Sequence, residues 1–144
     1  MMKKFFIVLV LLTSLALTGN AQLNFSCANT SAFPKNSTPD IGIIISSGDA
    51  ETVWNALRLA NLSQSKGDTV AIFVVGKGID AFLHENKEFD ILSLSTSFVS
   101  KGGQIYACGT CVKLRGTEEV KTCTVSSLND LYDIVKRSKK VLTF

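Results

Sequence analysis

The chain has 144 residues, of which 46% are hydrophobic, and a formal net charge of +3. This length suits one domain with a hydrophobic core and leaves too little chain for two. Basic residues cluster only at 136–140, where they suit the C-terminal end of a helix, so the charge pattern excludes a nucleic-acid-binding surface. Composition indicates an ordinary globular domain.

The first 21 residues have the pattern of a secretory signal peptide. Lys3 and Lys4 precede an unbroken apolar run over residues 5–12, and Gly19-Asn20-Ala21 has the small-x-small pattern of a cleavage site. A membrane anchor would need about 20 continuous apolar residues, and polar residues interrupt this run. We therefore predict a signal peptide over residues 1–21 and an exported protein, most simply in a bacterial periplasm. Loss of the two lysines lowers the net charge from +3 to +1.

Export places the four cysteines in a compartment where disulfides persist. Cys108 and Cys111 form a CxxC pair, whereas Cys27 and Cys123 lie far apart, and spacing alone does not define their pairing. A zinc ribbon built from four cysteines would show a second CxxC, which this chain lacks, so we predict no metal site. Cys123 is expected to be a buried, inert thiol.

The part that follows the signal peptide begins with a polar segment. Residues 22–40 are rich in Asn, Ser and Thr and contain both prolines, which predicts a flexible leader. The folded domain, residues 41–144, opens with a buried strand at 41–47, and Asp49 then caps a helix with an apolar stripe. A second buried strand at 69–75 completes a right-handed βαβ unit.

The turn after the second strand, residues 76–81, formally fits the G-x-G-x-x-A pattern of dinucleotide sites. Such a site also needs an acidic residue about 20 positions further on, and residues 98–104 contain none. The pattern normally follows the first strand of the unit, whereas this one follows the second. We therefore predict a plain turn and no cofactor.

The second half of the chain continues the alternation of strands and helices. Helices are expected at 81–85, 90–100, 111–116 and 128–137, and strands at 104–108, 122–126 and 141–144. This alternation predicts a three-layer α/β domain with a mostly parallel five-stranded sheet. Because functional groups gather at the carboxyl ends of parallel strands, Cys108 and Gly76 are expected at the functional edge.

The CxxC segment carries thiol chemistry. Cys111 opens the predicted short helix, near the positive end of its macrodipole, which favours thiolate over thiol. Residues three apart on a helical turn are close enough to exchange a sulfur atom. Gly109 and Thr110 are small, so we expect Cys108 to be an accessible thiolate, and Arg115 can help to stabilise a sulfur anion.

Four segments of the domain form a distinctive set: SGDAETVWNALRLAN, GDTVAIFVVGKGI, IYACGTCVKLRG and the closing VLTF. With these segments, residues 41–144 resemble the DsrE family of small sulfur-relay proteins. The resemblance implies a flavodoxin-like sheet, assembly into trimers or hexamers, and a cysteine that carries sulfane sulfur as a persulfide. That cysteine corresponds to Cys108 by its distance to Arg115-Gly116, and Cys111 is additional to the family's single-cysteine pattern.

We therefore predict a sulfur-relay protein, a sulfurtransferase-like persulfide carrier if it is catalytic, with Cys108 as carrier and Cys111 as a resolving or protecting thiol. Its partners would be donor and acceptor proteins or small sulfane-sulfur compounds, and copies of the chain would form a homo-oligomer. Two alternatives stay open. A periplasmic thiol-disulfide oxidoreductase would suit CxxC and export. The thioredoxin type of this enzyme needs a cis-proline that faces the disulfide, however, and both prolines of this chain precede the domain. In a non-catalytic oligomeric subunit, the pair would be a stabilising bridge.

Overall fold

The computed structural model describes residues 31–144, and the predicted signal peptide and Cys27 lie outside the described residues. The strands are β1 (Ile41–Ile45), β2 (Val70–Val74), β3 (Gln104–Cys108), β4 (Thr124–Ser126) and β5 (Lys140–Thr143). They form one sheet in the order β4-β3-β2-β1-β5, and every neighbouring pair is parallel. The predicted five-stranded, mostly parallel sheet is confirmed.

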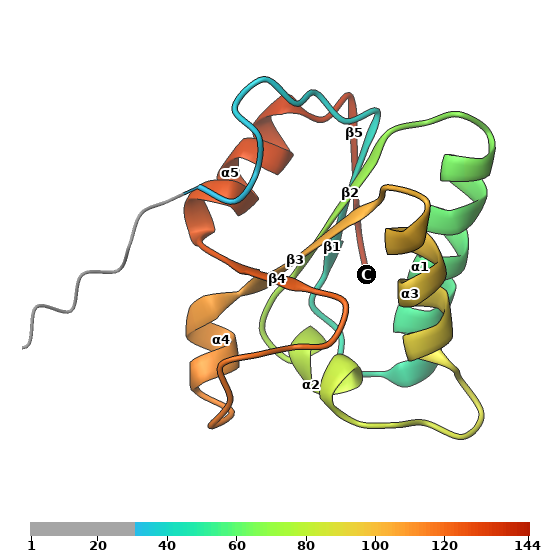
Figure 1. Ribbon diagram of the computed structural model, residues 1–144, viewed down its shortest axis with the longest axis vertical. Coiled ribbons are helices and arrows are strands. Elements are labelled where there is room, and N and C mark those ends of the chain that lie inside the picture. The colour runs from blue at the N-terminus through green and yellow to red at the C-terminus, as the bar shows by residue number, and fades with distance from the viewer. Residues whose placement is uncertain (1–30) are drawn as a thin grey trace, which may run out of the picture.

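Helices cover both faces of the sheet (Figure 1). They are α1 (Ala50–Ser65), α2 (Gly78–Leu83), α3 (Ile91–Ser100), α4 (Gly109–Lys113) and α5 (Leu128–Arg137). Helices α1 and α3 pack side by side over one face, and α5 lies over the other. From β1 to β3, each new strand is added on the same side of the one before it. The connection from β4 to β5 runs the other way, because β5 lies beyond β1 at the opposite edge of the sheet. Crossovers between parallel strands are right-handed, so a crossover that runs the other way places its helix, α5, on the opposite face of the sheet. This gives the three-layer, flavodoxin-like arrangement.

The larger core fills the space between the sheet and helices α1 and α3. Strands β1 and β2 supply Ile43 and Ile72 to it, α1 supplies Leu57, and α3 supplies Phe98, all fully buried. Asp49 caps α1 as predicted, since its carboxylate accepts a hydrogen bond from the backbone N–H of Thr52 at 2.9 Å. Within residues 31–144, no helix has the length and apolar character needed to span a membrane.

A smaller core lies between the sheet and α5, and it includes part of the predicted leader. Phe33 is 1% exposed, and its ring meets that of Tyr106 edge-on, with 5.7 Å between the centroids. Asp130 accepts hydrogen bonds from the backbone N–H groups of Ala32 and Phe33 at 3.1 and 3.2 Å. Residues 31–40 therefore differ from the flexible leader that was expected, because one aromatic ring and one buried carboxylate hold this segment against the domain.

The glycine-rich turn after β2 has a packing role. Helix α2 begins at Gly78, three residues earlier than expected, and a Cβ atom at this position would lie 2.5 Å from the carbonyl oxygen of Ile45. Gly76 has a φ of +57°, a left-handed conformation that glycine adopts without strain. The turn needs glycine so that it can pack closely on β1, which accounts for the pattern without a nucleotide.

Candidate functional site

The cysteine pair lies where β3 passes into α4, at the same end of the sheet as α2 (Figure 1). Cys108 is the last residue of β3 and directly precedes α4, and its neighbour across the sheet is Ser126 of β4. Cys111 lies within α4, which begins at Gly109 rather than at Cys111 and contains five residues. Both cysteines are therefore at the carboxyl edge, where the sequence predicted Cys108 to be.

Cys108 is buried, in contrast to the accessible sulfur that was expected. Its side chain is 4% exposed and belongs to the core beneath α5, together with Tyr106, two residues earlier on the same strand. The side chains of a strand alternate between its two faces, so Cys108 points into this core. The small size of Gly109 does not open the site, because a Cβ atom there would already lie 3.2 Å from the Ser126 carbonyl oxygen.

Burial also affects the pKa of this thiol. It raises the pKa of Cys108 above the ordinary value of a thiol, and the adjacent Cys111 side chain raises it further. The backbone N–H groups of Cys111 and Thr110 act in the opposite direction without reversing the shift. This shift opposes the thiolate that the sequence predicted for Cys108. Helix α4 is a single short turn, and its dipole is correspondingly small.

Cys111 has a different environment. Its side chain is partly exposed and contacts both cores from the turn of α4. The backbone N–H of Gly76 donates a hydrogen bond to the Cys111 sulfur at 3.3 Å, so the β2–α2 turn is part of the site. Gly76 was predicted to lie at this edge of the sheet, and the structure adds its hydrogen bond to the sulfur.

Arg115 connects the site to α2. Its guanidinium donates hydrogen bonds to both carboxylate oxygens of Asp80, through Nε to Oδ1 and through Nη2 to Oδ2 at 2.9 Å. Its third nitrogen, Nη1, donates to the backbone carbonyl of Cys111 at 2.9 Å. The guanidinium beside Asp80 holds the pKa of that carboxyl below its usual range, and the carboxylate raises the pKa of Arg115. Arg115 therefore fixes the end of α4 as well as placing a cation close to the two sulfurs.

Asp80 is a site residue that sequence reasoning missed. It lies in the first turn of α2, and 35 positions separate it from Arg115, so local spacing gives no indication of the pair. One signal was available: the residues that follow β2 and the residues that follow β3 must meet at one edge of a parallel sheet.

Cys123 lies on the other side of the sheet, where it packs against the larger core. Burial raises its pKa to about 12, which suits the unreactive thiol predicted from the sequence. Cys108, Cys111 and Cys123 are all free thiols. In the described part of the chain, no group of three or more His, Cys, Asp or Glu side chains is arranged to hold a metal ion.

Fold and site together define a class of protein: a parallel α/β domain that carries a pair of free cysteines at the carboxyl edge of its sheet. The model of the DsrE/DsrF-like family matches residues 40–144. This chain therefore belongs to the DsrE/DsrF-like family, as the resemblance implied.

Individual relatives extend this comparison. An uncharacterized protein of Methanopyrus kandleri is 29% identical over 102 residues, which cover 65% of this chain and 83% of that protein. The crystal structure of the ychN protein from E. coli superposes with a TM-score of 0.64 at 22% identity, over 74% of this chain and 99% of that one. A conserved protein of unknown function from Bacteroides thetaiotaomicron gives a TM-score of 0.62 at 20% identity, over 73% and 95%. At these identities the two structures establish a shared fold.

Proposed function

We propose that this protein relays sulfane sulfur and carries it as a persulfide on Cys108, with Cys111 as the partner thiol. The observation that carries the proposal is a pair of neighbouring free thiols at the carboxyl edge of the sheet, where β3 passes into α4, in a chain of the DsrE/DsrF-like family. Membership of this family suggests sulfur relay, and the neighbouring thiols supply a place where sulfur can be held.

The chemistry needs no external oxidant or reductant. A cysteine thiolate attacks the outer sulfur of a donor persulfide, R–S–SH, so that a new S–S bond forms and the donor's S–S bond breaks. The donor leaves as the thiolate RS⁻, and the protein holds Cys–S–SH. The same exchange, with an acceptor thiolate as the nucleophile, returns the sulfur and restores the cysteine.

The burial of Cys108 suits a residue that retains sulfane sulfur as a persulfide. A persulfide on a side chain that is 4% exposed is shielded from solvent and from small thiols. The same burial raises the pKa of Cys108, so the loaded and unloaded forms exchange slowly unless a neighbouring group takes part. Arg115 supplies a fixed positive charge near both sulfurs.

The setting of this relay is also a proposal. Donors and acceptors would be proteins or small sulfane-sulfur compounds, in the exported compartment to which residues 1–21 would direct the chain. Copies of the chain would assemble into a trimer or hexamer. Exposed apolar side chains on α5 support assembly, since Leu128 and Tyr132 are 63% and 60% exposed. Light scattering on the purified protein tests the oligomer.

Mass spectrometry tests the function directly. The purified protein is incubated with inorganic polysulfide, and its cysteine-containing peptides are analysed for the mass of one added sulfur atom. We expect loading on Cys108 in the wild type and in Cys123→Ser, and none at position 108 in Cys108→Ser. A wild type without added sulfur on Cys108 would contradict the proposal.

The two alternatives predict other results. A thiol-disulfide oxidoreductase would reduce insulin in the presence of dithiothreitol and would lose this activity when either cysteine is replaced. If a stabilising disulfide joined Cys108 and Cys111, mild reduction would break it and lower the melting temperature. A sulfur relay gives neither result, because its sulfur exchange requires a sulfane-sulfur donor.

A further inference from the structure

The two thiols of the pair differ in how they meet the solvent. Cys108 is 4% exposed and points into the core beneath α5, whereas Cys111 is partly exposed on α4. Cys111 nevertheless packs against the core to which Cys108 belongs, and its side chain is near enough to raise the pKa of Cys108. Of the two residues, Cys111 is therefore the more open to a donor persulfide that approaches from solvent.

We propose that Cys111 is the entry thiol of this protein: it takes the sulfane sulfur from the donor and passes it to Cys108, which stores it inside the domain. This inference rests on the proposed function and adds a direction to it. Cys111 becomes a residue that reacts with the substrate rather than a protecting thiol.

Two exchanges make up the relay. In the first, the Cys111 thiolate attacks the outer sulfur of R–S–SH, the donor leaves as RS⁻, and Cys111–S–SH forms. In the second, Cys108 attacks the outer sulfur of that persulfide, the Cys108–S–SH bond forms, and the S–S bond to Cys111 breaks. The proton of the Cys108 thiol moves to the departing Cys111 sulfur. Atoms and charge balance in both exchanges, and no redox partner is consumed.

The surroundings of Cys111 suit an atom that is alternately nucleophile and leaving group. The backbone N–H of Gly76 donates to its sulfur at 3.3 Å, which stabilises negative charge there in both exchanges. Arg115 holds the Cys111 carbonyl at 2.9 Å and brings a cation near the pair. Asp80 keeps this guanidinium in place through two hydrogen bonds.

The surroundings of Cys108 suit an atom that holds sulfur. Tyr106 and Phe73 lie in the same core, so large buried side chains help to shield this residue from solvent. Direct loading of Cys108 would require a donor to reach a residue that is 4% exposed and a thiol with a raised pKa to lose its proton first. With Cys111 as a neighbour, the proton has an acceptor within the pair.

A time-resolved loading experiment tests the direction. The protein is mixed with inorganic polysulfide, quenched by alkylation at successive times, and the sulfur on each cysteine is measured by mass spectrometry. In the wild type we expect added sulfur on Cys111 first and on Cys108 later. Cys108→Ser should keep the sulfur on Cys111. Cys111→Ser should load Cys108 at least about tenfold more slowly, because the buried thiol must then react directly.

Cys123→Ser is the matched control, because Cys123 lies on the other side of the sheet, and its loading course should equal that of the wild type. A wild-type measurement avoids dependence on the folding of a variant: brief alkylation that modifies Cys111 should block later loading of Cys108. Loading of Cys108 at an unchanged rate in Cys111→Ser, or before Cys111 in the wild type, overturns the inference and leaves the proposed function intact. Absence of sulfur from both cysteines contradicts the proposed function itself.

Discussion

Arg115 and Asp80 join α2 to the end of α4, the short helix that contains Cys111. The guanidinium of Arg115, which follows α4, meets the carboxylate of Asp80 on α2 with two hydrogen bonds, and its remaining nitrogen holds the Cys111 carbonyl. A helix of five residues has little stability of its own, so contacts of this kind decide where it lies. The position of Cys111 therefore depends on an ion pair between a residue of α2, in the connection after β2, and a residue that follows α4, in the connection after β3.

Replacing Arg115 with Gln should weaken both the fold and the loading of sulfur. Removing its ionic hydrogen bonds should lower the free energy of unfolding by a small but measurable amount, since the pair is partly exposed to solvent. Urea unfolding measures this loss, and polysulfide loading should slow in the same variant. Asp80→Asn is the partner variant. The double variant should lose less than the sum of the two single losses, and strictly additive losses would show that the pair does not act as a unit.

The three described cysteines should react with an alkylating agent in a fixed order. Cys111 is partly exposed and should react first, and Cys108 and Cys123 should react after it because burial raises the pKa of both thiols. Because the pKa of Cys108 is raised, its alkylation rate should still be increasing at a pH where an ordinary thiol has reached its plateau. Mass spectrometry of peptides from partly alkylated protein measures each rate. In urea-unfolded protein the three rates should converge, and a persistent order there would point to local sequence instead of burial.

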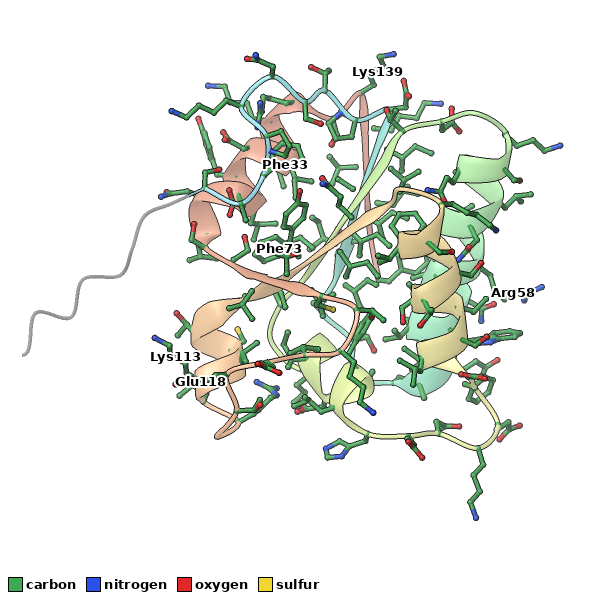
Figure 2. All side chains as sticks on the ribbon, viewed as in Figure 1. Phe33, Arg58, Phe73, Lys113, Glu118 and Lys139 are labelled. Atoms are coloured by element: carbon green, nitrogen blue, oxygen red, sulfur yellow. The ribbon has the colours of Figure 1, made fainter. Side chains whose placement is uncertain are left out.

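Phe33→Ala should destabilise the domain by about 3 kcal/mol or more, because it removes a fully buried aromatic ring and leaves a cavity. The loss falls on the core that also contains Cys108, on the α5 side of the sheet, where Figure 2 labels Phe33 and Phe73. Leu62→Ala on α1 is the control, since Leu62 is 55% exposed and its loss should change stability little. Equal stabilities of the two variants in urea would mean that residues 31–40 contribute nothing to the fold.

The central strands and the first helix could be predicted because the pattern of apolar residues in each of these segments fits only one type of secondary structure. The runs around Ile43 and Ile72 are β-branched and apolar on both faces, as a strand inside a parallel sheet requires. Asp49 precedes an apolar stripe with helical spacing, so the start of α1 was also predictable.

The burial of the site could not be predicted in the same way. Phe33 is a single aromatic residue in a polar segment, and only Tyr106 and Asp130, distant in sequence, show why it is buried. The direction in which Cys108 points follows from the strand alternation, but the sequence does not reveal that α5 covers that face. Pairing between residues of different crossovers, such as Arg115 with Asp80, depends on the same tertiary arrangement.

Asp130 should make the stability of this face depend on pH. Its carboxylate is fully buried and accepts hydrogen bonds from the hydroxyls of Ser31 and Ser126 and from two backbone N–H groups. Burial alone would raise its pKa, but these hydrogen bonds more than offset burial and hold the pKa below its usual value. A carboxyl with a lowered pKa in the folded state contributes stability that is complete above the unfolded pKa of about 3.9. That stability is lost as the pH falls from there toward the folded pKa.

Asp130→Asn should therefore lower the free energy of unfolding at pH 7 by about 1–3 kcal/mol, because an amide accepts fewer of these hydrogen bonds. The difference between the variant and the wild type should shrink as the pH falls below about 4, because the carboxyl of the unfolded wild type takes up a proton there while the folded one still resists protonation. Urea unfolding at pH 7, 5 and 3 measures this difference. Glu118→Gln, at an exposed position, is the control and should stay close to the wild type throughout. A difference for Asp130→Asn that remains constant from pH 7 to 3 would show that the carboxylate charge does not hold residues 31–33 on the domain.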